Sequence, residues 1–356
     1  MPDDRMTPPD VEAPAALTRR EVVGMGALLG TATLAGPTAA AFGQAGDPRD
    51  RRPAPPDARA RSAKTYDMKK SINMWAFPYP QRMSLRECFA LAARAGFDGI
   101  EVNYDLKDDL CPDTPEDKLK DIGKMARDLG LAVSGVCSFL FWPYSLTSND
   151  ADTRARGMEL ARRMIRAARL LGTENLLIVP GAVYIPWLPD SQPVDYAVAL
   201  QRAAQAVRDL LPDAQRERVY LNVENIFMNG FLLSPDDLVR FVDAFNSPWV
   251  RVHFDTGNIM QVQFPEHWIP ILGPRIKNVH LKEFTKKGTD WTLTSFRPLL
   301  DGTTDWPAVI EAFDQAGYRG YLTFEYFRPF LHYPEALIYQ ASDALDRLLG
   351  RTPRWT

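Results

Sequence analysis

Acidic side chains stand inside several of the most apolar runs of this sequence, where a charge needs a partner. The run YLNVENIF (220–227) places Glu224 among Val, Ile and Phe side chains. Three further runs carry a titratable residue at a comparable position: Asp255 in VRVHFDTGN (250–258), His280 in IKNVHLKEF (276–284) and Glu325 in GYLTFEYF (320–327). On an exposed strand every second side chain faces water, and such charges need no explanation. In a buried strand an unpaired charge is very costly, so its partner would indicate the function.

From residue 67 onward, short β-rich runs alternate with helical stretches. The strand-like runs are residues 69–77, 99–104, 131–139, 175–182, 218–226, 250–258, 276–284 and 320–327. Several of the helical stretches between them begin at Ser, Thr or Asp, and several end at Gly. Eight such alternations predict an α/β fold, a (β/α)₈ TIM barrel over residues 67–350. A doubly wound open sheet is the alternative, but no GxGxxG phosphate loop follows the first strand.

Side-chain parity predicts that the four titratable residues share one ring. Residues two apart on a strand point to the same face, so His253 shares a face with Asp255. Functional groups of such barrels collect at the C-terminal ends of the strands. Because helices wrap a barrel of this kind, its strands are not exposed to solvent. We therefore expect Glu224, Asp255 and the two later residues to meet at the barrel mouth.

The C-terminal half resembles the xylose isomerase-like TIM-barrel superfamily, in the sugar isomerase and epimerase branch that includes ketose 3-epimerases, hydroxypyruvate isomerases and inosose dehydratases. The matching stretches are NVEN (222–225), HFDTGN (253–258), NVHLKEF (278–284), TFEYF (323–327) and the run that starts with RPLLDGTTDW (297–306). Each stretch is weak alone, but together they follow in order at the spacing of successive strands. The resemblance covers residues 68–350 and implies one divalent ion held by two glutamates, an aspartate and a histidine.

Mapped onto this chain, the resemblance assigns the metal ligands to Glu224, Asp255, His280 and Glu325. Three carboxylates and an imidazole form an oxygen-rich site, so Mn²⁺ is the expected ion, with Mg²⁺, Co²⁺, Zn²⁺ and Fe²⁺ as alternatives. A divalent ion would also offset most of the buried negative charge. Such a site promotes enolisation of a sugar. We expect Glu224 and Glu325 to be the catalytic pair that removes and returns the proton beside the carbonyl.

Further side chains near the strand ends are candidates for substrate binding: Lys282, Asn258, His253, His267, Glu101, Trp75, Trp142, Trp187 and Arg297. Lys282 could donate to the substrate oxyanion, and a salt bridge to a carboxylate is an equal alternative. His253 is as well explained as a core histidine. Ketose 3-epimerases usually carry a histidine where this chain has Asn258, and Arg297 could replace a substrate-binding arginine that is missing from its usual place. These departures argue against ordinary free-ketose epimerisation more than against metal binding.

The first 66 residues have the composition of an export signal and a linker. Arg19 and Arg20 precede an apolar run, rich in Gly and Ala, that is too short to span a bilayer comfortably. This layout predicts a twin-arginine-type signal peptide over residues 1–45, and hence a periplasmic or extracellular protein without a stable membrane anchor. A basic tail with an incidental apolar patch is the alternative. Residues 46–66 are charged and proline-rich and are expected to form a disordered linker.

The overall composition restricts the class of partner. With 42 basic and 45 acidic side chains the net charge is only -3, which provides no field to attract nucleic acid. The three cysteines form no CxxC or CxxH spacing, so neither a structural zinc site nor a disulfide framework is indicated. A small sugar or keto-sugar is the expected partner. A single sequence neither indicates nor excludes a homo-oligomer.

The expected function is a divalent-metal-dependent isomerase or epimerase of a non-phosphorylated sugar or polyol, acting through an enediolate. One alternative is a lyase that uses the same residues to expel a group β to the carbonyl of an inosose or a 3-keto-glycoside. Another is a sugar-binding barrel without catalysis. Export favours non-phosphorylated substrates, because sugar phosphates are mainly cytoplasmic. An endonuclease of the abasic-site type is disfavoured, since its three-metal site needs more histidines than the four present.

Overall fold

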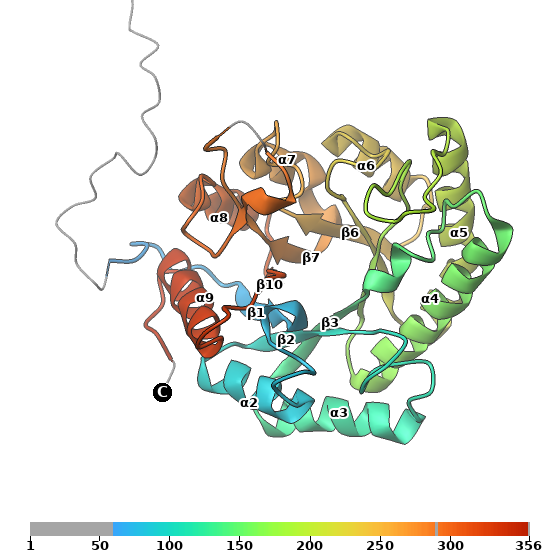
Figure 1. Cartoon of the computed structure of the whole chain (residues 1–356). Helices are drawn as coiled ribbons and strands as arrows, with labels where there is room; N and C mark the ends of the chain where they lie inside the picture. Colours follow the sequence, from blue (N-terminus) through green and yellow to red (C-terminus); the bar gives the residue numbers. More distant parts are fainter. Residues whose placement is uncertain (1–59, 289–290, 355–356) are drawn as a thin grey trace, which may run out of the picture. The chain divides into compact units, whose positions relative to one another are not determined.

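Eight parallel strands pair into a closed barrel in the computed structural model, which describes residues 60–288 and 291–354 (Figure 1). The barrel strands are β1 (Lys69–Asn73), β2 (Gly99–Asn103), β3 (Ala132–Cys137), β4 (Asn175–Ile178), β5 (Tyr220–Glu224), β6 (Val250–Asp255), β7 (Ile276–Leu281) and β10 (Tyr321–Phe324). Each pairs with the next along the chain, and β10 closes the barrel by pairing with β1. The predicted TIM barrel is confirmed.

A helix follows each barrel strand within the described residues, and these helices surround the barrel in Figure 1. They are α2 (Leu85–Arg94), α3 (Glu116–Asp128), α4 (Ala151–Leu171), α5 (Tyr196–Glu217), α6 (Pro235–Asp243), α7 (Pro265–Leu272), α8 (Trp306–Gln315) and α9 (Glu335–Leu348). Local chemistry sets their ends. Ser84 and Ser234 form capping boxes at the starts of α2 and α6. Gly172 ends α4 with a φ of 86°, which an L side chain rarely adopts.

The strands are shorter than the apolar runs expected from the sequence, because the chain turns early into the βα loops. The Asn73 side chain accepts from the Trp75 N–H, which ends β1 and starts the 3₁₀ helix η1 (Met74–Ala76). Ser138 starts η2 (Phe139–Phe141) after β3 in the same way. Further short elements are η3 (Gly273–Arg275), η4 (Leu293–Ser295) and the antiparallel pair β8 (Glu283–Phe284) and β9 (Phe296–Arg297).

Alternate positions along the strands separate an apolar outer layer from a polar barrel interior. Ile72, Val223 and Phe254 are fully buried between the barrel and its helices. The buried polar side chains of the interior include Ser71, Asn73, Glu101, Ser134, Asn175, Asn222, His253, Asn278 and Thr323. Several of them bond directly to one another: Ser71 with Ser134 at 2.7 Å, and Asn222 with Asn175 at 3.1 Å. The barrel interior can therefore hold charged side chains at its mouth on a hydrogen-bonded base.

A buried ion pair joins β1 to the C-terminal helix α9. Lys70 Nζ lies 2.6 Å from Asp346 Oδ2 and 2.8 Å from Ser342 Oγ. Neither side chain of the ion pair is exposed. Burial lowers the pKa of Lys70 and raises the pKa of Asp346.

The described chain contacts the barrel earlier than the expected boundary at residue 67. The Ser62 N–H donates to the Arg347 carbonyl at 2.8 Å, and Lys64 pairs with Glu311 at 2.9 Å. Residues 60–66, expected to belong to the linker, are thus fixed against the end of the chain. The expected signal peptide and the linker residues 46–59 lie outside the described residues.

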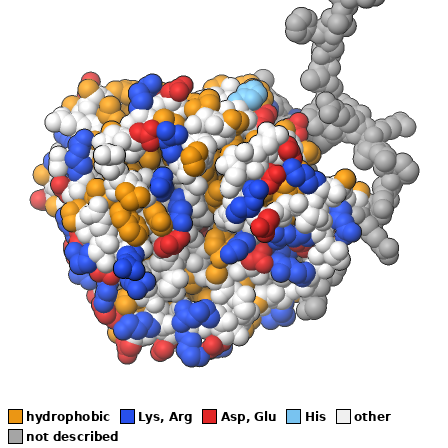
Figure 2. Space-filling view, turned by 180° about the vertical axis from the view of Figure 1, so that it is seen from behind, with side chains coloured by type: hydrophobic (Ala, Val, Ile, Leu, Met, Phe, Trp, Pro, Cys, Tyr) orange, Lys and Arg blue, Asp and Glu red, His pale blue; other side chains and the backbone are white. Residues whose placement is uncertain are grey.

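The surface of the described barrel carries both signs of charge. On the face shown in Figure 2, Lys and Arg side chains are interspersed with Asp and Glu, and apolar side chains lie between them. None of the helices in residues 60–288 and 291–354 combines the length and the apolar composition needed to cross a bilayer.

Candidate metal and proton-transfer site

Four titratable side chains converge at the C-terminal ends of β5, β6, β7 and β10. His280 Nδ1 lies 3.5 Å from Glu224 Oε1, 3.9 Å from Asp255 Oδ2 and 3.4 Å from Glu325 Oε1. All four residues are buried, and the most exposed of them, Glu224, has 6% of its surface accessible. The structure thus brings together the residues that parity placed in one ring.

His280 is oriented for binding a cation. Its Nε2 lies 2.5 Å from Glu101 Oε2, while its Nδ1 has no hydrogen-bond partner among the described residues. A proton on Nε2 would leave the lone pair of Nδ1 directed at the three carboxylates, which is unfavourable unless a cation lies between them. A carboxylate behind a histidine is also the usual support of a metal-ligating imidazole. The donor set therefore fits a hard divalent ion.

The charges around His280 are unbalanced within the described residues. Four buried carboxylates face or contact this ring, and the Lys282 ammonium is the cation that contacts them. Burial raises the pKa of Glu224, and raises the pKa of Glu325 to about 7. Burial alone would lower the pKa of His280, but the charges of Glu101 and Glu325 outweigh it and hold this pKa well above its ordinary value. With His280 neutral, as metal binding requires, and all four carboxyl groups ionised, three negative charges are in excess, and a bound divalent ion would offset two of them.

Backbone groups fix the orientation of Asp255. Its Oδ1 accepts from the N–H groups of Gly257 and Asn258, each at 2.8 Å. Asn225 exchanges two hydrogen bonds with the backbone of Asp255, at 2.8 and 2.9 Å. Asp255 Oδ2 is therefore left to face the site, and Asn225 supports the loop from the far side of β5.

Lys282 contacts two of the carboxylates and one amide at the edge of the site. Its Nζ lies 2.8 Å from Asp255 Oδ2, donates to Asn258 Oδ1 at 3.2 Å and pairs with Glu325. Burial alone would lower the pKa of Lys282, but the charges of Asp255 and Glu325 raise it. The salt bridge considered from the sequence is present. Because Lys282 also lines the adjoining cavity, its ammonium can reach a bound ligand as well.

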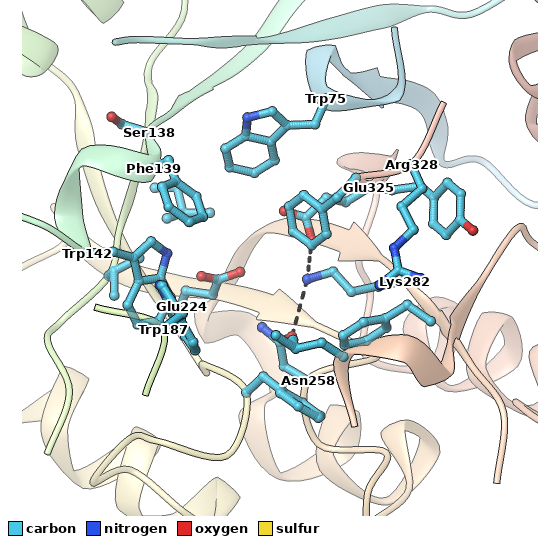
Figure 3. Close-up of a pocket in the computed structure, with 17 residues that line it drawn as sticks. Trp75, Ser138, Phe139, Trp142, Trp187, Glu224, Asn258, Lys282, Glu325 and Arg328 are labelled. Carbon is cyan, nitrogen blue, oxygen red and sulfur yellow. Dashed lines mark hydrogen bonds and ion pairs between the residues drawn. The ribbon is translucent and has the colours of Figure 1, made fainter. Parts of the chain in front are cut away.

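A cavity of about 330 Å³ opens directly onto these side chains (Figure 3). Its lining residues are Trp75, Ser138, Phe139, Trp142, Leu177, Val179, Trp187, Glu224, Phe227, Asn258, Lys282, Leu293, Phe296, Glu325, Tyr326, Phe327 and Arg328. Figure 3 shows the carboxylates of Glu224 and Glu325 directed into it, with Lys282 between Glu325 and Asn258. The volume suits a small organic ligand.

Five rings on one side of this cavity form a continuous series, which we call the aromatic arc: Phe327, Trp75, Phe139, Trp142 and Trp187. Successive ring centroids lie 5.1, 6.4, 6.5 and 5.0 Å apart in this order. The rings come from the loops that follow β10, β1, β3 and β4. Trp75, Trp142 and Trp187, expected from the sequence to bind substrate, thus lie together at the cavity.

Four other expected substrate-binding residues lie away from the cavity lining. Glu101 is buried behind His280. His253 is also fully buried, with neither ring nitrogen hydrogen-bonded in the described structure, and burial holds its pKa well below the ordinary value. His267 lies in α7 with its ring 5.3 Å from Phe264. Arg297 donates to the carbonyl groups of its own loop.

Sequence reasoning did not single out several residues at the site. Tyr326, Phe327 and Arg328 directly follow Glu325, so the rule that functional groups collect at strand ends could have found them. Glu283 was also missed. It is buried and accepts from Trp306 Nε1 at 2.5 Å and from Thr304 Oγ1 at 2.6 Å.

The Glu283 carboxylate anchors the turn between β9 and α8, DGTTDW (301–306). A Cβ at Gly302 would lie 2.1 Å from Glu283 Oε1, so this close approach requires glycine. Nothing in the local sequence of Glu283 indicates that its partners lie about twenty residues later.

A sequence model of the xylose isomerase-like TIM barrel family matches residues 89–348. The chain belongs to this family. Among curated relatives, L-ribulose-5-phosphate 3-epimerase UlaE of Escherichia coli K12 is 25% identical over 277 residues, which cover 74% of this chain and 91% of the relative. This relative and other proteins that are similar to the chain are named as sugar epimerases.

Solved structures of sugar epimerases have the same fold as this chain. An L-ribulose 3-epimerase aligns with a TM-score of 0.65 and 21% identity, over 80% of this chain and 95% of the other. D-Psicose 3-epimerase of Clostridium cellulolyticum H10, solved with D-tagatose, aligns with a TM-score of 0.64 and 18% identity, over 78% and 97%.

Proposed function

We propose that this protein is a divalent-metal-dependent epimerase or isomerase of a non-phosphorylated keto-sugar. The observation that carries the proposal is the pair of carboxylates, Glu224 and Glu325, which enter one ligand-sized cavity beside the unpartnered Nδ1 of His280. The relatives, which are named as 3-epimerases of L-ribulose 5-phosphate, L-ribulose and D-psicose, support the reaction class.

The ion would be held by Glu224, Asp255, His280 and Glu325, with Mn²⁺ as the first expectation. Bound there, it would act as a Lewis acid that polarises the substrate carbonyl. Glu101 would keep the Nδ1 lone pair of His280 directed at the ion by accepting a hydrogen bond from Nε2–H.

Proton transfer would be carried out by the two carboxylates of the cavity. One of them removes the proton on the carbon beside the carbonyl, and the electron pair of that C–H bond moves toward the carbonyl oxygen. The other returns a proton to the opposite face of the same carbon, which inverts it. Alternatively it returns the proton to the former carbonyl carbon while the hydroxyl proton of the first carbon moves to the former carbonyl oxygen, which moves the carbonyl. Both carboxylates line the cavity, so each is within reach of a sugar bound there. Lys282 would donate to the developing oxyanion.

A non-phosphorylated substrate is supported by the cations of the cavity. Its lining contains two, Lys282 and Arg328, and Lys282 is already paired with Asp255 and Glu325. One exposed arginine is a weak phosphate site, since phosphate recognition normally combines several donors.

Export through the twin-arginine pathway to the periplasm is part of the same proposal. A fusion of residues 1–66 to a reporter, compared with an Arg19→Lys/Arg20→Lys variant, tests it directly.

Deuterium exchange tests the proposed reaction. The Mn²⁺-loaded protein is incubated in D₂O with a free ketose, an inosose or a 3-keto-glycoside, and NMR follows deuterium uptake and configuration. We expect uptake beside the carbonyl with a changed stereocentre or a moved carbonyl. Glu224→Gln and Glu325→Gln should each abolish uptake, whereas Glu116→Gln, at an exposed ion pair on α3, should retain it.

Two other outcomes would overturn the assignment in different ways. Uptake accompanied by loss of water or of an aglycone would replace the epimerase with a lyase that uses the same carboxylates. Absence of uptake with every substrate, while the protein still binds metal and sugar, would leave a sugar-binding barrel.

A further inference from the structure

The aromatic arc is larger than the recognition of one sugar ring requires. A pyranose or furanose stacks its C–H face on one or two aromatic rings, whereas five rings follow one another along this side of the cavity. Phe139, Trp187 and Phe327 are 46%, 36% and 42% exposed, so they are not simply core residues. Exposed aromatic surface that is continuous over several loops marks a binding surface.

The rest of the cavity wall offers few partners for hydroxyl groups. Of its polar side chains, Glu224, Glu325 and Lys282 belong to the reaction site, and Asn258 already bonds to Lys282 and Asn225. The polar groups that remain are the side chains of Ser138, Tyr326 and Arg328 and the indole N–H groups of the tryptophans, and Ser138 donates its hydroxyl hydrogen to the Tyr104 carbonyl at 2.6 Å. A free hexose placed here would leave some of its hydroxyl groups without partners, which is unfavourable for each of them.

Apolar side chains outside the arc also line the cavity. They include Phe227, Phe296 and Leu293, and the ring centroids of Phe227 and Phe296 lie 5.3 Å apart. The cavity is therefore polar at its base and apolar along its walls. A ligand that matches it is polar at one end and apolar at the other.

We propose that the substrate is a keto-sugar that carries an aromatic substituent, and that the aromatic arc binds this substituent. This inference rests on the proposed function, which places the carbonyl of the sugar beside Glu224 and Glu325. The arc shares the cavity with both carboxylates, so one molecule can occupy both parts. Planar rings stack on Trp and Phe in offset or edge-to-face arrangements, as the rings of the arc do with one another.

A matched pair of inert glycosides tests the inference without turnover. Phenyl β-D-glucopyranoside and methyl β-D-glucopyranoside share one sugar and differ only in the aglycone, and neither has a carbonyl to enolise. Isothermal titration of the Mn²⁺-loaded protein should give a dissociation constant at least about tenfold lower for the phenyl compound, as burial of one aromatic ring implies. Trp142→Ala and Phe327→Ala should each remove most of that ratio. Tyr196→Ala, an exposed aromatic residue outside the cavity, should leave it unchanged.

The outcomes separate this inference from the proposed function. A phenyl-to-methyl ratio near one, a ratio that the arc variants do not reduce, or no binding of either glucoside at millimolar concentration overturns the inference, even if free ketoses exchange deuterium. An arc-dependent ratio without deuterium exchange on any keto-sugar supports aromatic recognition and overturns the epimerase. If the protein shows both the arc-dependent ratio and deuterium exchange, a phenyl 3-keto-glucoside at low concentration should take up deuterium faster than its methyl counterpart. Trp142→Ala should reduce that difference in rate.

Discussion

Glu101 and His280 meet inside the barrel at 2.5 Å, although their strands β2 and β7 are not neighbours. Asn73 Nδ2 donates to the same carboxylate oxygen of Glu101 at 2.8 Å. Glu101 therefore reaches across the barrel to hold Nε2 of His280, while Nδ1 of the same ring faces the carboxylates of Glu224, Asp255 and Glu325.

Replacing Glu101 with glutamine should weaken metal binding without unfolding the protein. The variant keeps the shape of the side chain but loses the charge that holds His280 in position, and changes of this kind reduce metal affinity by roughly 10- to 100-fold. Free Mn²⁺ measured by electron paramagnetic resonance during titration gives the affinity. The exposed Glu116→Gln serves as control. Equal affinities for Glu101→Gln and wild type would show that the contact has no part in metal binding.

Metal affinity should rise with pH through about pH 7. The pKa of Glu325 in the metal-free protein is raised from 4.5 to about 7, so below that pH an ion must displace its proton. A Mn²⁺ titration at a series of pH values measures the slope. In Glu325→Gln this proton is absent, so metal affinity should depend less steeply on pH between 4.5 and 7. An unchanged dependence would show that Glu325 is not the group whose proton the metal displaces.

The same pKa shift predicts the pH dependence of stability without metal. A carboxyl group whose folded pKa is raised contributes stability that is fully present below pH 4.5 and is lost as the pH rises through 7. Urea unfolding of the metal-free protein should therefore show Glu325→Gln gaining stability relative to wild type as the pH increases through this window. A constant difference between the two proteins would contradict it.

The ring of catalytic candidates was predictable from the sequence because it depends on strand parity alone. Glu224, Asp255 and Glu325 stand at strand ends, and an error of one residue in a strand boundary does not change the face to which they point. Parity could not separate His253 from Asp255, since both point inward and only depth in the barrel distinguishes them. It could not place Glu101 either, because its contact with His280 exists only once the barrel has closed.

The loops were less predictable than the strands. His267 and Arg297 were expected near the substrate from their positions in the sequence. They lie in α7 and in the short strand β9, whose orientation relative to the barrel mouth no local pattern gives. The aromatic residues were recognised individually. Their arrangement into one arc depends on loops from four different strands, and local sequence carries no information on that contact.

Breaking the buried pair of Lys70 and Asp346 should destabilise the protein strongly. Asp346→Asn leaves the Lys70 ammonium buried without a counter-charge, and such losses amount to about 3–5 kcal/mol. The double variant Lys70→Met/Asp346→Leu removes both charges and should lose considerably less. Urea unfolding of the metal-loaded proteins measures both. If the double variant is as unstable as the single one, packing rather than charge dominates at this position.

Removing the Glu283 carboxylate should loosen the turn at residues 301–306. Glu283→Ala leaves the buried indole N–H of Trp306 and the backbone N–H of Thr304 without acceptors. Each loss should lower the free energy of unfolding by roughly 1–3 kcal/mol. Glu283→Gln retains one oxygen and should lose about half as much. Unfolding in urea gives the stability, and inductively coupled plasma spectrometry gives the bound manganese. Loss of manganese at full stability would instead make Glu283 part of the metal site.

The proposed reaction residues and the proposed recognition surface of this barrel come from different stretches of the chain. Glu224, Asp255 and His280 belong to β5, β6 and β7, while most of the aromatic arc follows β1, β3 and β4. The two sets meet at β10, where Glu325 and Phe327 are two residues apart. Mutations in the loops after β1, β3 and β4 can therefore alter which molecules are accepted while the proton-transfer residues and Glu101 stay intact. Such a division allows new substrates to arise through changes in these loops alone, in evolution or by design.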